Sequence, residues 1–193
     1  GGVTLNSSST FRRTDAFNNA NDNVFKGSLK ANDNPNNWAW VAQKPSGSDD
    51  INNAMLHVST DKSENLWVVI GADRLATSAN SYLDFEFLQN TLTVNGNGTF
   101  SSSGQNSGRT VGDLQLTLKL SSNGGKPDLF IQRWQNDGAG FNWVDVTPSS
   151  ESDSVFAATN GGTTAAPFTA FGGPNYAANQ FGEAAVNLSL LLQ

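Results

Sequence analysis

The clearest pattern in the chain is a strict alternation of apolar and polar residues near its middle. Leucine occupies the even positions from 114 to 120, and polar residues occupy the odd positions from 113 to 119. Successive side chains of a strand point to opposite faces, so this segment can bury one face and expose the other. The Asn-Gly-Gly sequence at 123–125 suits a tight turn, and an aromatic and branched segment follows at 128–134. The pattern predicts an antiparallel hairpin of a layered all-β protein.

Further strands follow from the same periodicity. Alternation predicts strands at 54–59 and 82–89, and the continuous apolar run at 66–70 predicts a central strand covered on both faces. Shorter candidate strands lie at 1–10, 38–43, 91–94, 143–146 and 186–190.

Two long polar stretches separate these strands. We interpret 11–37 as loop, and 148–182 as a long surface loop or crossover, because it exceeds the length of an ordinary connection. No segment predicts a helix longer than a turn or two. The sequence therefore predicts a two-sheet antiparallel sandwich of jelly-roll or Greek-key type, forming a single domain over residues 1–193.

The composition agrees with a sandwich of this size. A chain of 193 residues fits one large β-domain, and its twelve Phe and five Trp supply bulky side chains for a core. Only 15% of residues are charged, and Asn, Ser, Thr and Gly dominate the polar remainder. Such residues favour turns and strand faces over helices.

The charge and the cysteine content limit the classes of partner and the cellular location that the protein can have. The net charge is −6, with no basic run beyond Arg12-Arg13, which argues against nucleic acid as a partner. No stretch approaches the roughly 20 apolar residues of a membrane span. The chain has no Cys and begins with Gly-Gly rather than Met, so we interpret it as a mature or excised piece. The sequence predicts a secreted or cell-surface bacterial protein.

Asp84 and Glu86 are the strongest candidates for catalysis. On one strand they share a face at about 7 Å, within the separation of about 6.5–9.5 Å that inverting glycosidases use. Position 89, where a third acid could follow, is Gln, and Arg133 could simply pair with one of the two carboxylates. His57 is the only histidine, and no Ser or Thr near it has the sequence signature of a nucleophile, which argues against a His-based nucleophilic triad. The sequence favours a structural role for the acids and predicts no catalytic residue.

Asp and Asn residues crowd the loops at 21–23, 32–34 and 49–50. Oxygen-rich loops are typical of Ca²⁺ sites, although none of these matches the twelve-residue EF-hand loop. The alternative is that these side chains bond their own backbone in turns. Asp49 and Asp50 are the predicted ligands if an ion binds, and no other cofactor is expected.

Trp38 and Trp40 lie two residues apart, on one face of the predicted strand at 38–43. Aromatic pairs form platforms on which sugar rings stack, and they fill sandwich cores equally well. The pair is therefore a candidate carbohydrate-binding site, with core packing as the alternative.

Both ends of the chain carry short apolar strands. Val3 and Leu5 mark one, and the alternating Val186, Leu188 and Leu190 mark the other. Exposed apolar edges pair readily with another molecule. The sequence thus predicts that a terminal strand joins the sheet of a neighbouring copy.

Seven segments together resemble a jelly-roll-like domain of large secreted bacterial surface proteins of the adhesin-like type. They are Asp-Asn-Val-Phe-Lys-Gly at 22–27, Asn-Trp-Ala-Trp at 37–40, Asp-Asp-Ile-Asn-Asn-Ala at 49–54, Gly-Ala-Asp-Arg at 71–74, the segment 82–89, Gly-Arg-Thr-Val-Gly-Asp-Leu at 108–114, and Phe-Gly-Glu-Ala-Ala-Val-Asn-Leu at 181–188. The resemblance implies a secreted module of an adhesin-like or cell-wall-associated chain, and it implies no catalytic residue.

The leading interpretation is a non-enzymatic surface or matrix module that mediates adhesion or self-assembly, and it includes a filament subunit built by strand donation. Its partners would be other copies of itself or surface polysaccharide. Two alternatives stay open: a carbohydrate-binding module, and a glycoside hydrolase or lyase that uses Asp84 and Glu86.

Overall fold

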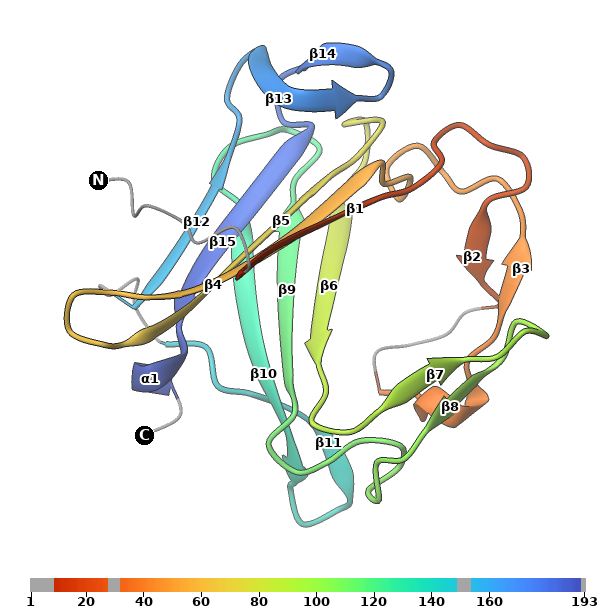
Figure 1. Cartoon of the computed structure of the whole chain (residues 1–193), viewed down its shortest axis with the longest axis vertical. Coiled ribbons are helices and arrows are strands. Elements are labelled where there is room, and N and C mark those ends of the chain that lie inside the picture. The colour runs from red at the N-terminus through yellow and green to blue at the C-terminus, as the bar shows by residue number, and fades with distance from the viewer. Residues whose placement is uncertain (1–8, 28–31, 149–153, 192–193) are drawn as a thin grey trace.

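Two antiparallel sheets pack face to face in the computed structural model, which describes residues 9–27, 32–148 and 154–191 (Figure 1). The predicted all-β antiparallel sandwich is confirmed. The first sheet has five strands, in the order β1 (Thr10–Thr14), β4 (Asn53–Thr60), β5 (Leu66–Asp73), β15 (Phe181–Asn187) and β12 (Val155–Thr159). The second has four, in the order β11 (Phe141–Asp145), β10 (Asp128–Asn136), β9 (Leu114–Leu120) and β6 (Ser81–Phe87).

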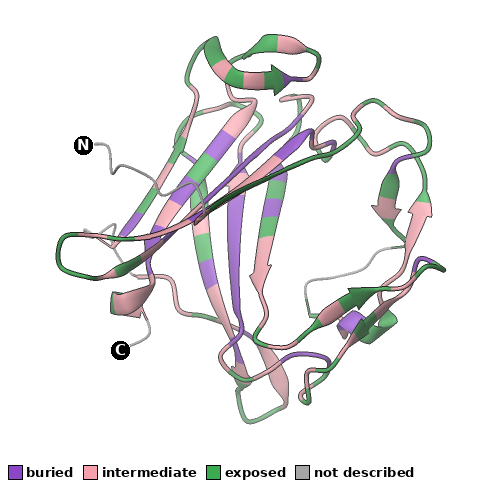
Figure 2. Ribbon diagram, in the orientation of Figure 1, coloured by how far each residue is buried: buried purple, intermediate pink, exposed green. Residues whose placement is uncertain are grey.

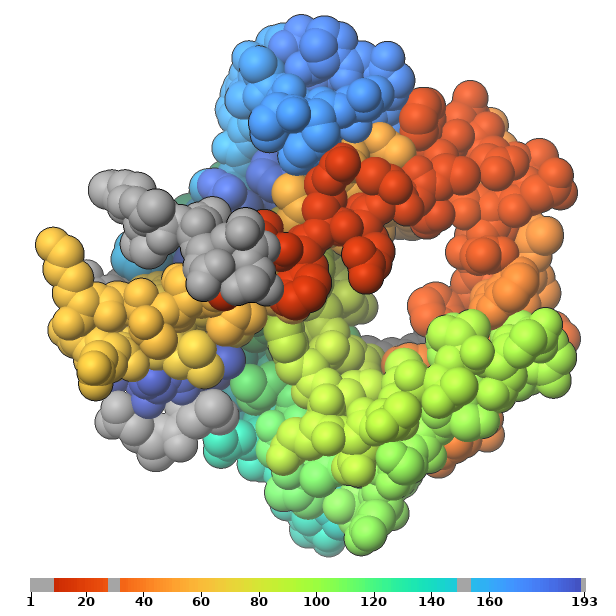
Figure 3. Space-filling view, in the orientation of Figure 1, coloured from red at the N-terminus to blue at the C-terminus, as the bar shows by residue number. Residues whose placement is uncertain are grey.

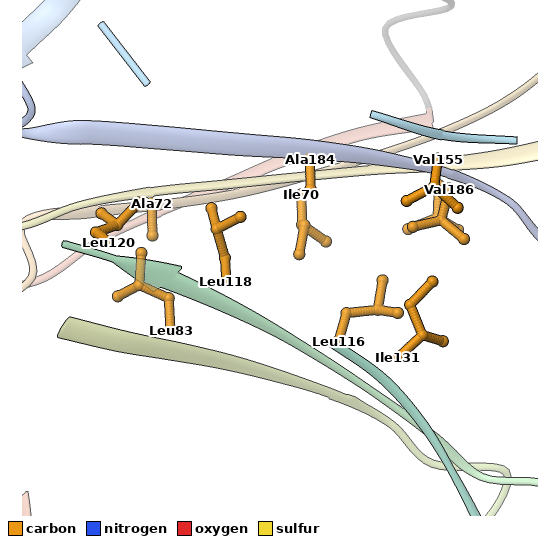
Figure 4. Close-up of a cluster of buried hydrophobic side chains, with 11 residues drawn as sticks. Ile70, Ala72, Leu83, Leu116, Leu118, Leu120, Ile131, Val155, Ala184 and Val186 are labelled. Carbon is orange, nitrogen blue, oxygen red and sulfur yellow. The ribbon is translucent and has the colours of Figure 1, made fainter. Parts of the chain in front are cut away.

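The leucines of β9 form the centre of the core. Leu116, Leu118 and Leu120 are fully buried and point toward the five-stranded sheet, where Ile70 and Val186 meet them (Figure 4). β9 is buried along nearly its whole length, as Figure 2 shows. Its alternation therefore predicted the inward face correctly, while the outward face of β9 is also covered.

A glycine sets the spacing between the sheets at one end of the core. A Cβ atom on Gly182 of β15 would lie only 2.6 Å from Cδ2 of Leu120 and 2.9 Å from Cδ2 of Leu118. These distances are well below van der Waals contact. Any larger residue at 182 would push the two layers apart.

A projecting arm stands beside β6. It consists of β2 (Asn23–Phe25), β3 (Trp40–Ala42), β7 (Leu92–Val94), β8 (Phe100–Ser102) and the 3₁₀ turn η2 (Pro35–Asn37). A bridge between Ala39 and Thr99 joins its two hairpins. The space-filling view shows an opening between this arm and β6 (Figure 3).

A second added piece lies at the top of the sandwich in Figure 1. β13 (Thr164–Ala170) and β14 (Gly173–Tyr176) form a hairpin above the five-stranded sheet (Figure 1). Its turn uses Phe171 and Gly172, both with positive φ, at 48° and 80°. Glycine adopts such a conformation freely, whereas phenylalanine does so only when its surroundings hold it.

The structure corrects the predicted loops. The stretch 148–182 contains β12, β13 and β14 rather than one long loop, and 11–37 contains most of β1 as well as β2. The predicted strand at 186–190 is wrong beyond Asn187, because a short helix, α1 (Leu188–Leu191), follows. The predicted strand at 1–10 lies almost entirely outside the described residues.

Candidate functional site

A cleft of about 440 Å³ lies between the β13–β14 hairpin and the outer face of the five-stranded sheet. Residues from several elements line it: Met55 of β4, Ala158 of β12, Phe168 of β13, Tyr176 of β14, and Phe181 and Glu183 of β15. The floor residues alternate with the core residues of their strands, as Glu183 does with the buried Ala184. The sheet thus fills the sandwich with one face and supplies this cleft with the other.

Aromatic rings form much of the cleft. Tyr176 stacks on Phe181 with ring centroids 5.3 Å apart, and Phe168 meets Tyr176 edge-on at 6.4 Å. The guanidinium of Arg12 lies 4.5 Å from the centre of the Phe168 ring. Phe168 is half-buried, so part of its surface faces solvent at the mouth of the cleft.

Tyr176 fixes the hairpin onto the sheet through a buried carboxylate. Its hydroxyl donates a 2.7 Å hydrogen bond to Oδ2 of Asp73, whose exposure is 0%. Asp73 also accepts bonds from the backbone N–H groups of Asn52 and Asn53, at 2.7 and 2.8 Å, and from the Asn53 amide at 2.8 Å. Burial and the bond to Asp73 raise the pKa of Tyr176 above its usual range. The phenol therefore stays neutral and remains a donor.

The turn of the hairpin is held by contacts that explain its unusual phenylalanine. The backbone N–H of Phe171 donates to Oδ1 of Asn52 at 3.0 Å, and its ring packs edge-on against Phe17 at 5.5 Å and against Tyr176 at 6.4 Å. These contacts tie the hairpin tip to Asn52, the residue before β4, and to the loop after β1. The walls of the cleft are therefore anchored at both ends.

Glu183 is the free charged group of the cleft. Glu183 is exposed on β15, and its carboxylate has no ion pair or hydrogen bond to any described residue. The neighbouring amide of Asn160 is committed, because it donates to the carbonyls of Gly162 and Ala177 at 3.0 and 2.6 Å. A ligand in the cleft would thus meet apolar rings and one available carboxylate.

Glu86 lies in a very different setting, on the outer face of the four-stranded sheet. Its carboxylate receives two bonds from Arg109, at 3.0 Å from Nη2 and 3.2 Å from Nε. Burial raises the pKa of Glu86, and the Arg109 guanidinium opposes that rise. Asp84, on the same face, accepts a short hydrogen bond from the hydroxyl of Thr117. Both acids are held by structural partners.

Arg109 is a buried residue that the sequence did not single out as a site. It is 0% exposed, and its guanidinium carbon lies 5.3, 4.8 and 5.0 Å from the ring centres of Trp38, Trp134 and Trp143. We call Arg109, Glu86 and these three rings the arginine cage. The chain has few cationic residues, and Arg109 stands alone in a loop rich in Ser and Gly. An isolated arginine in such a loop was the feature of the sequence that could have pointed to it.

The predicted pairing of Arg133 with Asp84 or Glu86 is wrong. Arg133 pairs with Leu114 in the sheet and so faces the core side, whereas Glu86 pairs with Gln115 and faces outward. Arg133 lines a second cavity of about 740 Å³, where its Nε atom is buried without a hydrogen-bond partner in the described part of the chain.

Trp38 and Trp40 do not form a free platform. Trp38 packs against Phe25 and Phe100, at centroid distances of 5.5 and 5.9 Å, and also contributes to the arginine cage. Trp40 lies against the backbone of Gly98, whose added Cβ would come within 3.4 Å of the indole. Both rings are half-buried within the arm.

Asp49 and Asp50 are neighbours in sequence but lie in different environments. Asp49 is exposed and accepts a bond from the Ser46 hydroxyl, whereas Asp50 is 1% exposed. In the part of the chain that the structure describes, no three or more His, Cys, Asp and Glu side chains gather in a way that could hold a metal ion.

The predicted assembly residues fall into three groups. Val3 and Leu5 lie outside the described residues. Val186 is fully buried in β15, which is paired on both sides, with β5 and with β12. Leu188 and Leu190 belong to α1. The expectation of an uncovered edge on this last strand is therefore wrong.

Comparisons with protein-family models, with curated proteins and with solved structures gave no match, so the function must be argued from this chain alone. Within residues 9–27, 32–148 and 154–191, no helix has the length and apolar character needed to cross a membrane.

Proposed function

We propose that this chain is a non-enzymatic extracellular surface module that mediates adhesion by binding carbohydrate. The binding site is the cleft between the β13–β14 hairpin and the five-stranded sheet. The observation that carries the proposal is the meeting of Phe168, Tyr176 and Phe181 with the unpaired Glu183 in a cavity of about 440 Å³.

The chemistry of the cleft suits a sugar. The C–H faces of a sugar ring pack against aromatic side chains, and its hydroxyls donate hydrogen bonds to a carboxylate such as that of Glu183. Binding pockets for small ligands usually combine an apolar lining with a few polar groups, in volumes of about 300–1,000 Å³. The cleft meets these conditions with residues held on strands rather than on loose loops.

The surroundings of the candidate acids support a binding module rather than a hydrolase. Hydrolysis by a pair of carboxylates requires one acid to give a proton and the other to attack or to activate water. Glu86 is instead held by two bonds from Arg109, and Asp84 accepts from Thr117. The cleft itself presents a single free carboxylate.

An extracellular setting is supported by the sequence. The chain has no Cys, a net charge of −6 and a surface rich in Asn, Ser and Thr, and it resembles domains of adhesin-like surface proteins. Self-assembly through the last strand loses its basis, because both edges of β15 are already paired. Binding of polysaccharide is therefore the form of adhesion that we carry forward.

A glycan array followed by calorimetry on the bound sugars tests the proposal. Phe168→Ala and Glu183→Gln should each weaken binding about tenfold or more, because the first removes a stacking surface and the second replaces one carboxylate oxygen by an NH2 group and removes the charge. Glu183 is exposed, so its variant should unfold at the same temperature as the wild type.

Phe130→Ala is the matched control, since Phe130 is a partly exposed phenylalanine on the other sheet. It should bind as the wild type does. The proposal fails if no glycan binds, or if the two cleft variants bind as tightly as the Phe130 variant.

A further inference from the structure

Asp50 has a carboxylate oxygen that the protein leaves without a partner. The residue is 1% exposed, and its Oδ2 atom accepts a 2.8 Å bond from the backbone N–H of Asn18. Its Oδ1 atom is buried and has no hydrogen bond among the described residues. Such an orphaned oxygen is costly unless another group satisfies it.

The bond from Asn18 to Asp50 comes from a loop that is held near both of its ends. The loop, residues 15–22, is pinned at its start by two bonds with Asn52: its first N–H donates to the Asn52 carbonyl at 2.8 Å, and its first carbonyl accepts from the Asn52 amide at 2.7 Å. At its end, the carbonyl of Asp22 accepts from the N–H of Gln43 at 2.8 Å. Asn52 and Gln43, which lie on either side of Asp50 in the sequence, therefore hold the loop at its two ends.

The neighbourhood of Asp50 has an excess of negative charge. Burial raises the pKa of Asp50, and the nearby carboxylates of Asp22 and Asp15 raise it further. Asp22 is itself only 6% exposed. The bond from Asn18 and the charge of Lys44 act in the opposite direction. A small positively charged ligand would relieve both the repulsion and the missing contact.

We infer that Asp50 and the loop 15–22 bind a divalent cation of the calcium type. The Oδ1 atom of Asp50 and the carboxylate of Asp22 would be the charged ligands, and backbone and Asn oxygens of the loop would complete the shell. Calcium accepts 6–8 oxygen ligands from irregular loops, whereas magnesium demands near-ideal octahedral geometry. This inference refines the predicted pair: Asp50 stays, and Asp22 replaces the exposed Asp49.

Thermal unfolding with calcium chloride and with chelator tests this site. Only two carboxylates contribute, so we expect weak binding, with a Kd of about 0.1–1 mM as in extracellular modules. Calcium at 10 mM should raise the Tm of the wild type by about 3–6 °C, and magnesium should have a much smaller effect. Calorimetry with calcium chloride should give the same affinity.

Asp50→Asn should affect the calcium-induced rise in Tm and the Tm in chelator in opposite directions. It should abolish the calcium shift, yet in chelator it should unfold at or above the wild-type temperature, because it removes a buried charge. Asp22→Asn should weaken calcium binding about tenfold or more, since ligand charge sets affinity in such sites.

Asp49→Asn is the matched control, because it changes the adjacent exposed carboxylate by the same chemistry. It should keep the full calcium shift. Equal wild-type Tm values in calcium and chelator would overturn the inference, as would loss of the shift in the Asp49 variant. The cleft is a separate site, so glycan binding in chelator tests the proposed function independently of this one.

Discussion

The outer faces of the two sheets each bury a polar group beneath an added piece of chain, but they do so by opposite means. On the four-stranded sheet, the arm covers an ion pair, Arg109–Glu86, whose cation contacts three tryptophan rings. On the five-stranded sheet, the Asp73 carboxylate accepts bonds only from neutral donors among the described residues: the Tyr176 hydroxyl of the β13–β14 hairpin, and N–H groups of Asn52 and Asn53.

The two arrangements differ in which side chains they leave accessible to a ligand. A desolvated ion pair stabilises only if both partners stay engaged, and Arg109, which is 0% exposed, donates two bonds to Glu86. The neutral network around Asp73 uses the hydroxyl of Tyr176 and leaves the rings beside it to line an open cleft. The first face places its ion pair beside the arm, and the second lines the cleft proposed above as the binding site.

Breaking the arginine cage should have the largest effect on stability. Arg109→Met should lower the free energy of unfolding by about 3–5 kcal/mol, because it leaves the Glu86 carboxylate, whose side chain is only 15% exposed, without its cation. Glu86→Gln should cost less, since the amide still accepts one bond from Arg109. Urea unfolding of the three proteins gives the order.

The exposed pair Lys119–Asp128 is the control for that experiment, with a comparable N–O distance of 2.9 Å. Lys119→Met should cause no measurable change, because solvent screens the pair. If Arg109→Met were as harmless as Lys119→Met, the cage would have no structural role.

The neutral network should give a smaller loss. Tyr176→Phe removes one donor from the buried Asp73 and keeps the ring, so the free energy of unfolding should fall by about 1–3 kcal/mol. Tyr82→Phe, at an exposed tyrosine, is the matched control and should unfold as the wild type does. A larger loss at Tyr176 than at Arg109 would reverse the comparison.

The smallest expected effect is the loss of the stability contributed by the Tyr176 hydroxyl at alkaline pH. The pKa of Tyr176 is raised in the folded protein, so its neutral form is stabilised there relative to the unfolded chain, where the pKa is about 10. The stability that this hydroxyl contributes is therefore complete below pH 10 and declines as the pH rises beyond it. The difference in unfolding free energy between the wild type and Tyr176→Phe should shrink accordingly, and a constant difference up to pH 11 would contradict this.

Much of the sandwich could be predicted because its strands obey simple local rules. The leucines of β9, the apolar run of β5 and the Asn-Gly turns between β7 and β8 and between β9 and β10 each determine strand or turn without reference to distant residues. Strands whose sequences have only a weak pattern were not predicted. β13 reads Thr-Ala-Ala-Pro-Phe-Thr-Ala, which has little β-branched or alternating character, and it forms a strand because β14 and the sheet below support it.

The candidate site depended on register, which composition and spacing do not reveal. The register between β10 and β9 places Arg133 on the core side, away from Glu86. A shift of one residue would turn Arg133 to the outer face, because such a shift exchanges the two faces of a strand. Likewise, Asp49 and Asp50 look equivalent in the sequence. Their separation into exposed and buried groups arises from the distant loop 15–22 and its bond to Asp50.

The arginine cage also has a consequence for the order of folding. Its members include Trp38, Glu86, Arg109 and Trp143, so its closure joins segments more than a hundred residues apart in sequence. Contacts of such long range form slowly, because the chain between them must first be confined. The β9–β10 hairpin can form early from neighbouring residues, whereas the arm docks only after the sheet that carries Glu86 and Trp143 exists. We therefore expect the contacts of the arginine cage to form late in folding.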